Sequence, residues 1–228
     1  MIIYGKQVCL YALSQHESIV KTVYIAKKGI LPQKLYDKYK SRIKFLEDRW
    51  AQSMAKGGNH QGVLLEIEEF VQSDLATMKQ NRFVLVLDTL TDTGNIGAIV
   101  RTAYALGADG IIATGVKQLN FASMIRTSSG ALLDMPFVVI PNILDVINEL
   151  KQVNFKFYGA SMDGSSIDAC RFEGSRALVL GSEGEGISKR AKPKIDEMVS
   201  IEMQREFDSL NVSAAAAILI HRMRYEVK

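Results

Sequence analysis

The second half of the chain alternates short apolar runs with helical patterns. The first run, Phe83 to Leu87, is apolar at every position, which is typical of a strand buried on both faces of a parallel sheet. Further strands are expected at residues 110–114, 137–140, 156–160, 177–181 and 198–203. Apolar residues at helical spacing predict helices over residues 96–106, 143–151 and from Asn211 onward. This alternation predicts an α/β domain with a mainly parallel sheet.

The first part of the chain has a less regular pattern. Short strands are expected at residues 23–26 and 63–67, with a turn-rich loop before the second. Pro32 suits the first turn of a helix, and apolar residues on one face extend the expected helix to about Trp50. The first part is therefore expected to be a small α+β domain.

A change of pattern separates the two parts. Residues 66–80 predict an amphipathic, helical connector, which the polar pair Asn81-Arg82 ends before the first buried strand. The boundary is expected between residues 70 and 82, which gives one domain over residues 1–75 and another over residues 83–228.

The composition is that of a globular protein with a substantial core. Of the 228 residues, 47% are apolar and 23% are charged. No apolar run approaches the roughly 20 residues that a membrane span needs. Cys9 and Cys170 are too few and too far apart for a disulfide framework or a zinc site, and the three histidines lack metal-ligand spacing. We therefore expect a cytoplasmic protein that needs neither a membrane nor a metal.

Charge is unevenly distributed between the two parts. Residues 1–60 carry eleven Lys and Arg against four Asp and Glu, whereas the remainder carries seventeen against twenty-one. A basic first part suggests an anionic partner, with nucleic acid as the first candidate. A solvated basic helix near residues 34–49 would explain the same asymmetry without any partner.

Three loops that follow expected strands carry the candidate chemistry, because ligands of parallel sheets bind beyond the carboxyl ends of the strands. In the first loop, Asp92 and Asn95 suit a turn and a helix start, and Gly97 permits close approach. Arg101 lies one helical turn beyond Gly97, on the same face. Its apolar neighbours suggest partial burial of this Arg, which needs an anion or a carboxylate, so a functional role and a structural salt bridge are equally open.

The second loop places three glycines and two carboxylates directly after the strand expected at residues 177–181. The spacing of Gly181, Gly184 and Gly186 is not that of a phosphate-binding loop, and the intervening Glu183 and Glu185 would repel phosphates. The glycines suit a tight path around a neutral or cationic ligand. An ordinary turn is the less favoured alternative.

The third loop leads into an unusually smooth helix. Ser209 or Asn211 can cap this helix, and Ala214 to Ala217 leave room for another backbone or a flat ligand. Taken alone, the segment predicts an ordinary capped helix. Together the three loops offer polar side chains and bare backbone without a metal cluster or a Ser-His-Asp set, which suits a flat cationic cofactor.

Three motifs in this order closely resemble those of the SpoU-type, or TrmH-like, RNA ribose 2′-O-methyltransferases of the SPOUT superfamily. The motifs are Asn95-x-Gly97-x-x-x-Arg101-x-Ala103, Leu178-Val-Leu-Gly181-Ser-Glu183-Gly184-x-Gly186, and Ile201-x-Met203 with Ser209-Leu210-Asn211-Val212-Ser213. The resemblance covers residues 83–228 and implies S-adenosylmethionine as methyl donor, a deep C-terminal trefoil knot and a homodimer. Shorter matches at Tyr4-Gly5, residues 23–26 and residues 60–63 resemble the small substrate-binding domain of the ribosomal-RNA members.

The resemblance also implies roles for individual residues. The catalytic set that it implies is Arg101, Asn95, Glu183, Ser209 and Asn211. The implied cofactor-binding set is Gly181, Ile201, Leu210, Ala160, Ser161 and Met203.

The chain departs from the family pattern at two places. Glu202 and the pair Thr93-Gly94 stand where Pro is common, which affects loop rigidity and leaves the polar residues in place. Because family members with a separate front domain act on large-subunit ribosomal RNA, the resemblance implies ribosomal RNA as the substrate and a guanosine of 23S rRNA as the target. The alternatives are a tRNA ribose 2′-O-methyltransferase and a non-catalytic RNA-binding protein of ribosome assembly.

Overall fold

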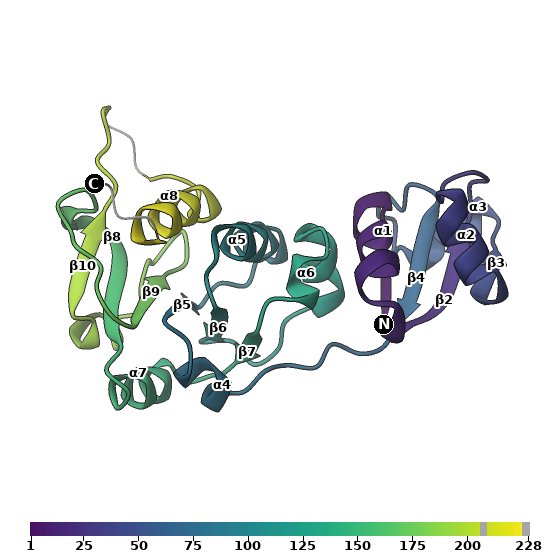
Figure 1. Ribbon diagram of the computed structural model, residues 1–228. Coiled ribbons are helices and arrows are strands. Elements are labelled where there is room, and N and C mark those ends of the chain that lie inside the picture. Colours follow the sequence, from purple (N-terminus) through teal and green to yellow (C-terminus); the bar gives the residue numbers. More distant parts are fainter. Residues whose placement is uncertain (206–208, 225–228) are drawn as a thin grey trace. The chain divides into compact units, whose positions relative to one another are not determined.

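The computed structural model describes residues 1–205 and 209–224, and the chain divides into two compact units (Figure 1). The first unit comprises residues 1–71 and 120–134, and the second comprises residues 72–119 and 135–228. The chain therefore leaves the first unit, builds part of the second, and returns to the first for fifteen residues before completing the second.

The second unit is built on a six-stranded sheet in which every neighbouring pair is parallel. The strand order is β10-β8-β9-β5-β6-β7, and the strands are β5 (Phe83–Asp88), β6 (Gly110–Thr114), β7 (Phe137–Val139), β8 (Lys156–Ser166), β9 (Arg176–Leu180) and β10 (Glu197–Ser200). Strands β5, β6 and β9 are buried at every position, because helices cover both faces of the sheet. All six predicted strands are confirmed, and β8 extends beyond its predicted end.

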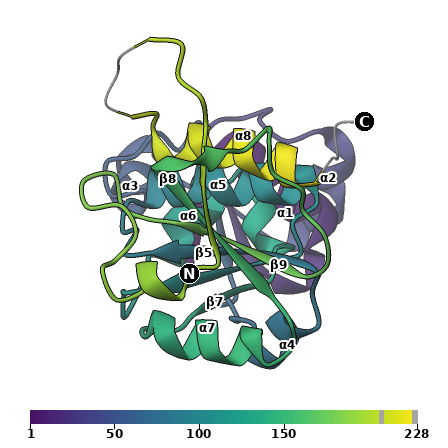
Figure 2. The ribbon, with the colours of Figure 1, turned by 90° about the vertical axis from the view of Figure 1, so that its left-hand side faces the viewer.

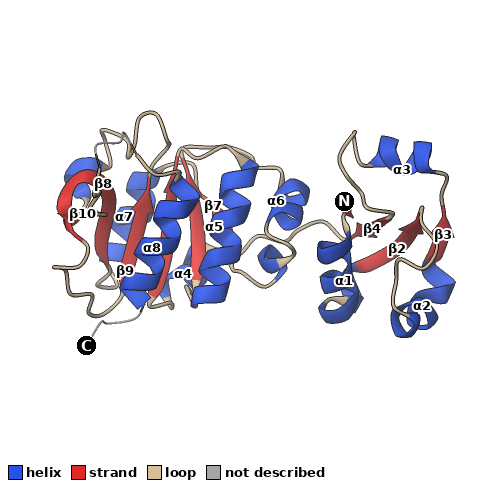
Figure 3. Cartoon of the chain, turned by 90° about the horizontal axis from the view of Figure 1, so that it is seen from above, coloured by secondary structure: helices blue, strands red, loops and turns tan. Residues whose placement is uncertain are grey.

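Two pairs of helices cover the sheet on opposite faces (Figures 2 and 3). One pair is α5 (Thr93–Leu106) with α8 (Val212–Arg224), and the other is α4 (Leu75–Lys79) with α7 (Ile143–Lys151). The carboxylate of Asp92 accepts a hydrogen bond from the Asn95 backbone N–H and so caps α5, which ends at the left-handed Gly107. The three helices predicted between and after the strands are confirmed.

The first unit is built on a smaller, mixed sheet with the order β1-β4-β2-β3. The β1–β4 and β4–β2 pairs are antiparallel, and the β2–β3 pair is parallel. The strands are β1 (Ile2–Tyr4), β2 (Val20–Ile25), β3 (Ile43–Phe45) and β4 (Val63–Ile67), and the helices are α1 (Lys6–Gln15), α2 (Gln33–Tyr39), α3 (Asp48–Met54) and α6 (Phe121–Thr127).

The single helix predicted from Pro32 to about Trp50 is wrong. Helix α2 ends at Tyr39, β3 follows, and α3 begins only at Asp48. Ile43 and Phe45 flank Lys44, so the segment also fits the two-residue period of a strand. It pairs with the open edge of β2, where its backbone groups find partners, and this pairing outweighs the helical pattern.

The helical connector predicted over residues 66–80 is also largely wrong. Strand β4 continues to Ile67, and only α4 (Leu75–Lys79) is helical. Asp74 caps this short helix by accepting a hydrogen bond from the Thr77 backbone N–H.

Residues 120–134 complete the first unit through aromatic and polar contacts. Helix α6 packs on β1, and the Arg126 guanidinium lies 5.2 Å from the centre of the Tyr4 ring. The Tyr11 hydroxyl donates a 2.5 Å hydrogen bond to Asp134, and the Phe70 and Phe121 rings stack. A segment more than a hundred residues away in sequence therefore covers part of this unit.

None of the described helices has the length and apolar character that crossing a bilayer requires. The trefoil knot implied by the family resemblance stays a prediction.

Candidate functional site

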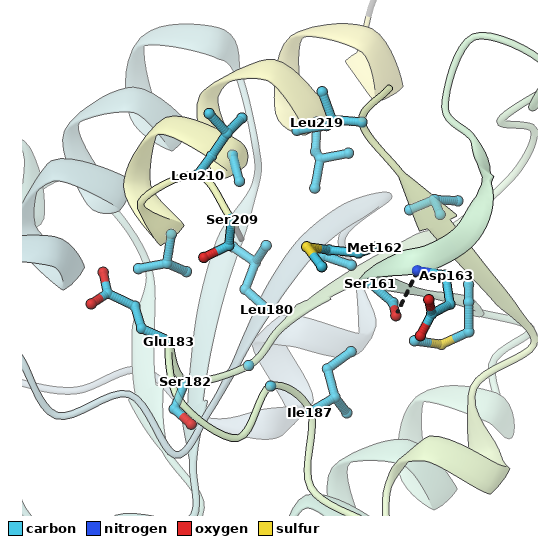
Figure 4. Close-up of a pocket in the computed structure, with 18 of the residues that line it drawn as sticks. Ser161, Met162, Asp163, Leu180, Ser182, Glu183, Ile187, Ser209, Leu210 and Leu219 are labelled. Carbon is cyan, nitrogen blue, oxygen red and sulfur yellow. Dashed lines mark hydrogen bonds between the residues drawn. The ribbon is translucent and has the colours of Figure 1, made fainter. Parts of the chain in front are cut away.

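A cavity of about 590 Å³ opens where the carboxyl ends of β8, β9 and β10 meet the start of α8 (Figure 4). This position follows the rule for parallel sheets that ligands bind beyond the carboxyl ends of the strands. Leu180, Ile187 and Leu219 supply apolar wall, and Glu183 and Ser209 lie together on one side of the cavity. The extended end of β8, with Ser161, Met162 and Asp163, forms another wall.

The path of the glycine-rich loop after β9 requires a glycine at position 181. A Cβ atom on Gly181 would lie 2.0 Å from the backbone carbon of Gly186, far closer than real contacts. The Ser182 N–H donates to the Gly186 carbonyl at 3.2 Å, and the Gly186 N–H donates to the Ser182 carbonyl at 2.9 Å. Gly186 has a φ of 66°, which glycine adopts without steric cost. The loop therefore folds back on itself and exposes backbone toward the cavity.

The residues predicted to bind the cofactor come together around this cavity. All six line it, and they arise from β8, from the loop after β9 and from the segment between β10 and α8: Ala160, Ser161, Gly181, Ile201, Met203 and Leu210.

A cluster of amide and carboxylate groups lies beside the cavity. The Asn211 side-chain N–H₂ donates to Glu183 Oε1 at 2.8 Å and to Asn95 Oδ1 at 3.0 Å. The Asn95 side-chain N–H₂ donates to the same Glu183 oxygen at 3.1 Å. Three of the five predicted catalytic residues, one from each candidate loop, are therefore in mutual contact.

The other two predicted catalytic residues occupy different positions. Ser209 lines the cavity, whereas Arg101 lies on α5 with an exposed side chain. The partial burial that its apolar neighbours suggested is therefore wrong, because Ile99, Val100 and Ala103 face the core while Arg101 lies on the opposite side of α5.

Asn211 also fixes the start of α8. Its Oδ1 accepts hydrogen bonds from the Ser213 backbone N–H at 2.9 Å and from the Ser213 hydroxyl at 2.6 Å. The same side chain thus uses its oxygen to cap the helix and its nitrogen to hold Glu183 and Asn95. The structural and functional readings of this residue are compatible.

Several further residues of the cavity wall were not assigned a role from the sequence, although Met162 and Asp163 lie in a strand end, residues 160–163, that the rule for parallel sheets had singled out. Among them are Met162, Asp163, Ile187, Lys192, Met198 and Leu219. Only the extension of β8 beyond Ala160 was missed, because Gly164 and the serines around it do not resemble a strand. Gly164 lies so close to the backbone of Met198 and Val199 that no other residue fits there.

The charged residues around the cavity are mainly acidic. Asp163, Glu183 and Glu185 contribute carboxylates, and Lys192 contributes the single ammonium among the described lining residues. Within the described ranges, no group of three or more His, Cys, Asp or Glu residues is placed to hold a metal ion. The cavity is thus suited to a ligand that carries positive charge.

Comparison with protein-family models gives two matches. Residues 82–221 match the SpoU rRNA Methylase family, and residues 2–72 match the family described as RNA 2'-O ribose methyltransferase substrate binding. The first match alone covers more than half of the chain.

Curated relatives match most of the chain. The chain is 30% identical over 190 residues to the 23S rRNA (guanosine-2'-O-)-methyltransferase RlmB of Neisseria meningitidis serogroup B, covering 80% of this chain and 76% of the relative. It is 31% identical over 176 residues to the putative TrmH family tRNA/rRNA methyltransferase YacO of Bacillus subtilis, covering 73% of this chain and 70% of the relative.

Solved structures share the fold over nearly the whole chain. The AdoMet-bound rRNA methyltransferase of Sinorhizobium meliloti superposes with a TM-score of 0.81 at 22% identity, covering 98% of this chain and 86% of its own. The SpoU methyltransferase AviRb of Streptomyces viridochromogenes, in complex with AdoMet, gives a TM-score of 0.78 at 23% identity, with 98% and 88% covered.

Proposed function

The chain belongs to the SpoU rRNA methylase family, and from this we propose that it transfers a methyl group from S-adenosylmethionine to a ribose 2′-hydroxyl of RNA. The observation that carries the proposal is the contact between Asn95, Glu183 and Asn211 beside the cavity. These residues come from three separate loops, and a purely structural α/β domain has no need to bring them together at a cavity mouth.

The cavity fits the proposed cofactor in size and in charge. Its volume of about 590 Å³ lies within the roughly 300–1,000 Å³ typical of pockets for small ligands. Gly181 and Leu210 offer backbone groups and Ile201 apolar surface, as a flat nucleoside requires. When bound, S-adenosylmethionine supplies a methyl group on a positively charged sulfur, and the carboxylates around the cavity favour that charge.

The catalytic residues have separable tasks in this proposal. The 2′-hydroxyl must lose its proton as its oxygen bonds to the methyl carbon and the carbon–sulfur bond breaks, and a guanidinium, which keeps its proton in proteins, is a poor acceptor for that proton. We therefore assign the exposed Arg101 to an RNA phosphate, which a guanidinium binds with two parallel hydrogen bonds. In this way Arg101 positions the ribose without taking its proton.

Glu183 and its neighbours orient the ribose. The amides of Asn95 and Asn211 both donate to Oε1 of Glu183, so these bonds leave Oε2 available to accept a hydrogen bond from a ribose hydroxyl. Ser209 lies on the same side of the cavity and adds a hydroxyl. Orientation of this kind accelerates a reaction by holding the reacting atoms in line.

We assign RNA capture to the first unit, chiefly to residues 1–75. Its exposed cations include Lys27, Lys28, Lys40, Lys44 and Arg49, and phosphate contacts of this kind make affinity depend on salt. The family match over residues 2–72 supports the assignment. Trp50, which is 57% exposed beside Arg49, offers a face on which an unpaired base can stack.

The proposed substrate is ribosomal RNA in the cytoplasm, and the proposed target is a guanosine of 23S rRNA. The Neisseria relative, which is named for that reaction, supports this target, whereas the Bacillus relative is named for tRNA or rRNA and supports the alternative. Mass spectrometry of nucleosides from 23S rRNA and tRNA, with and without the gene, tests the choice. Loss of one 2′-O-methylguanosine from 23S rRNA is expected, and loss from tRNA alone would favour the alternative.

Titration calorimetry with S-adenosylmethionine tests whether the chain is an enzyme at all. Micromolar binding is expected. Absence of binding by the folded protein, together with retained RNA affinity, would favour a non-catalytic protein of ribosome assembly.

The proposed active form is a homodimer that associates through α5 and α8. These helices pack together, and they leave Tyr104 45% and Ile218 43% exposed. Apolar surface of this kind is typical of a protein interface. Light scattering should give twice the 25.3 kDa chain mass, and an Ile218→Lys variant should shift toward the monomer.

A further inference from the structure

Asp88, the last residue of β5, is a carboxylate with 0% exposure. Burial of an ionised group is costly unless hydrogen bonds compensate it. Among the described residues, no ion pair with a Lys, Arg or His involves Asp88. A carboxylate in such a place needs hydrogen-bond partners that offset the free-energy cost of its burial.

Two hydrogen bonds fill that role. The Ser188 backbone N–H donates to Asp88 Oδ2 at 2.8 Å, and the Thr114 hydroxyl donates to Asp88 Oδ1 at 3.2 Å. Thr114, at the end of the adjacent strand β6, is itself 0% exposed. The first contact spans a hundred residues of sequence and reaches the end of the glycine-rich loop.

This loop is held at two points. At one, Ser182 and Gly186 are joined by their mutual backbone hydrogen bonds. At the other, Ser188 is bound to Asp88, immediately after Ile187 turns into the cavity wall with 6% exposure. Glu183 lies within the turn that the first pair of bonds closes, and the bond to Asp88 fixes the chain two residues beyond that turn, so the position of Glu183 depends on both.

Asp88 also stands at the start of the loop that carries Asn95. The next residue, Thr89, has a φ of 61°, which is rare for a β-branched residue and indicates a conformation imposed by its surroundings. Its backbone N–H donates to the Thr114 carbonyl at 2.9 Å. The roots of the Asn95 loop and of the Glu183 loop therefore meet at one buried carboxylate.

We propose that Asp88 is a positioning residue of the active site: its carboxylate anchors the glycine-rich loop through the Ser188 N–H, and so sets Glu183 against Asn95 and Asn211. The identity of the ligand in this inference rests on the proposed function. The anchoring itself does not, because it concerns the ligand-free chain. Asp88 touches no substrate and acts only through the loop.

The test compares Asp88→Asn with Thr114→Val in the full-length protein. Both changes are nearly isosteric. Thr114→Val removes only the contact to Thr114, whereas Asp88→Asn removes the negative charge that strengthens both contacts, so only Asp88→Asn weakens the bond to the loop. Charge-assisted hydrogen bonds are the stronger kind. We therefore expect Asp88→Asn to raise the Kd for S-adenosylmethionine about tenfold or more, and Thr114→Val to change it less than about threefold.

Hydrogen exchange without ligand provides a second readout. In Asp88→Asn, the amides of residues 182–188 should exchange about tenfold faster than in wild type, and in Thr114→Val they should stay near wild type. Equal effects of the two variants in exchange, or none, would overturn the anchoring role. If wild type fails to bind S-adenosylmethionine while the exchange difference holds, the proposed function fails and the positioning role stands.

A variant from the loop side covers the case in which Asp88→Asn does not fold. Ser188→Pro removes the donor and leaves the carboxylate in place. It should raise the Kd and accelerate exchange as Asp88→Asn is expected to do, and wild-type values in a folded Ser188→Pro protein would contradict the proposal.

Discussion

The two units carry their polar groups in different places. In the first unit the notable groups are on the surface: Phe45 is 59% and Trp50 57% exposed, and each has an exposed cation, Lys44 or Arg49, next to it in the chain. In the second unit, backbone and side chains from separate loops converge on one cavity. A surface of charge and aromatic rings binds many sequences with strong salt dependence, whereas a cavity selects one ligand by shape and hydrogen bonds.

This difference separates RNA capture from chemistry in the proposed function. Substitutions in the first unit should change RNA affinity and its salt dependence. Substitutions at the cavity should change cofactor affinity or turnover at a given RNA occupancy. A variant that alters both properties together would show that the two tasks are not divided in this way.

The largest effect is expected from Arg101→Ala. Because Arg101 is assigned to the substrate rather than to the cofactor, turnover should fall about 10²–10³-fold while the Kd for S-adenosylmethionine changes less than about twofold. Single-turnover methyl transfer and calorimetry measure the two quantities. Arg101→Lys is the matched variant, which keeps the charge but loses the paired hydrogen bonds, and it should recover only part of the rate. Wild-type turnover in Arg101→Ala would remove the assignment.

The next effect should come from Gly181→Ala. The added Cβ would collide with the backbone of Gly186, so the loop must shift, at a cost of about 1–3 kcal/mol. We expect the Kd for S-adenosylmethionine to rise about 10–100-fold with RNA affinity unchanged.

Gly184→Ala is the control for that substitution. A Cβ on Gly184 would meet no atom within 4 Å, and the residue does not need a positive φ. The Kd of the Gly184→Ala variant for S-adenosylmethionine should stay within about threefold of the wild-type value. If both variants bind equally well, the close approach of Gly181 and Gly186 is not what shapes the cavity.

The difference between the two units also explains how much of the fold could be predicted from the sequence. In the second unit, continuous apolar runs such as Phe83 to Leu87 have one stable arrangement, in a sheet covered on both faces, so strands and helices followed from local pattern. In the first unit, β3 forms because β2 has an open edge, and no local signal reports an open edge. Residues 121–127 belong there only through contacts with residues such as Tyr4.

Some residues of the candidate site could likewise be predicted from the sequence, and others could not. Gly181, Glu183 and Asn211 could be proposed from loop position and from motif resemblance, and the structure brings them to one place. The role of Asp88 could not be foreseen, because an acidic residue at a strand end is common and its partner is a backbone N–H a hundred residues away. The exposure of Arg101 depends on which face of α5 meets the sheet, which its apolar neighbours alone did not reveal.

A moderate effect is expected from charge reversal in the first unit. Lys40→Glu with Lys44→Glu should weaken RNA binding about tenfold or more at low salt and lower the slope of log K against log salt by about one to two. Deletion of residues 1–75 is a poorer test, because α6 packs on β1 and the deletion would expose the face of α6 that this contact buries. Trp50 is the single tryptophan of the chain, so quenching of its fluorescence measures RNA binding to this unit.

Lys40→Gln with Lys44→Gln is the matched control, since it removes charge without reversing it. It should give a smaller loss of RNA affinity, and both double variants should keep wild-type affinity for S-adenosylmethionine. An unchanged salt slope in the reversed variant would contradict a phosphate-binding role for these two lysines.

The smallest effect should come from a charged pair on the surface of the second unit, Lys156 with Glu197, to which no role in binding is assigned. Lys156 Nζ lies 2.8 Å from Glu197 Oε2, and this pair joins β8 to β10. The hydrogen bond from Lys156 lowers the pKa of Glu197, so the stabilisation is present at pH values above the ordinary carboxyl pKa and is lost as pH falls through the lowered one. Because Lys156 is 46% exposed, solvent weakens the pair and Lys156→Met should lower the free energy of unfolding by less than about 1 kcal/mol.

Denaturant unfolding of Lys156→Met, Glu197→Gln and the double variant at pH 7 isolates the interaction energy of the pair. A coupling well above that limit, or one that persists in acid, would mean that this surface pair is stronger than its exposure allows.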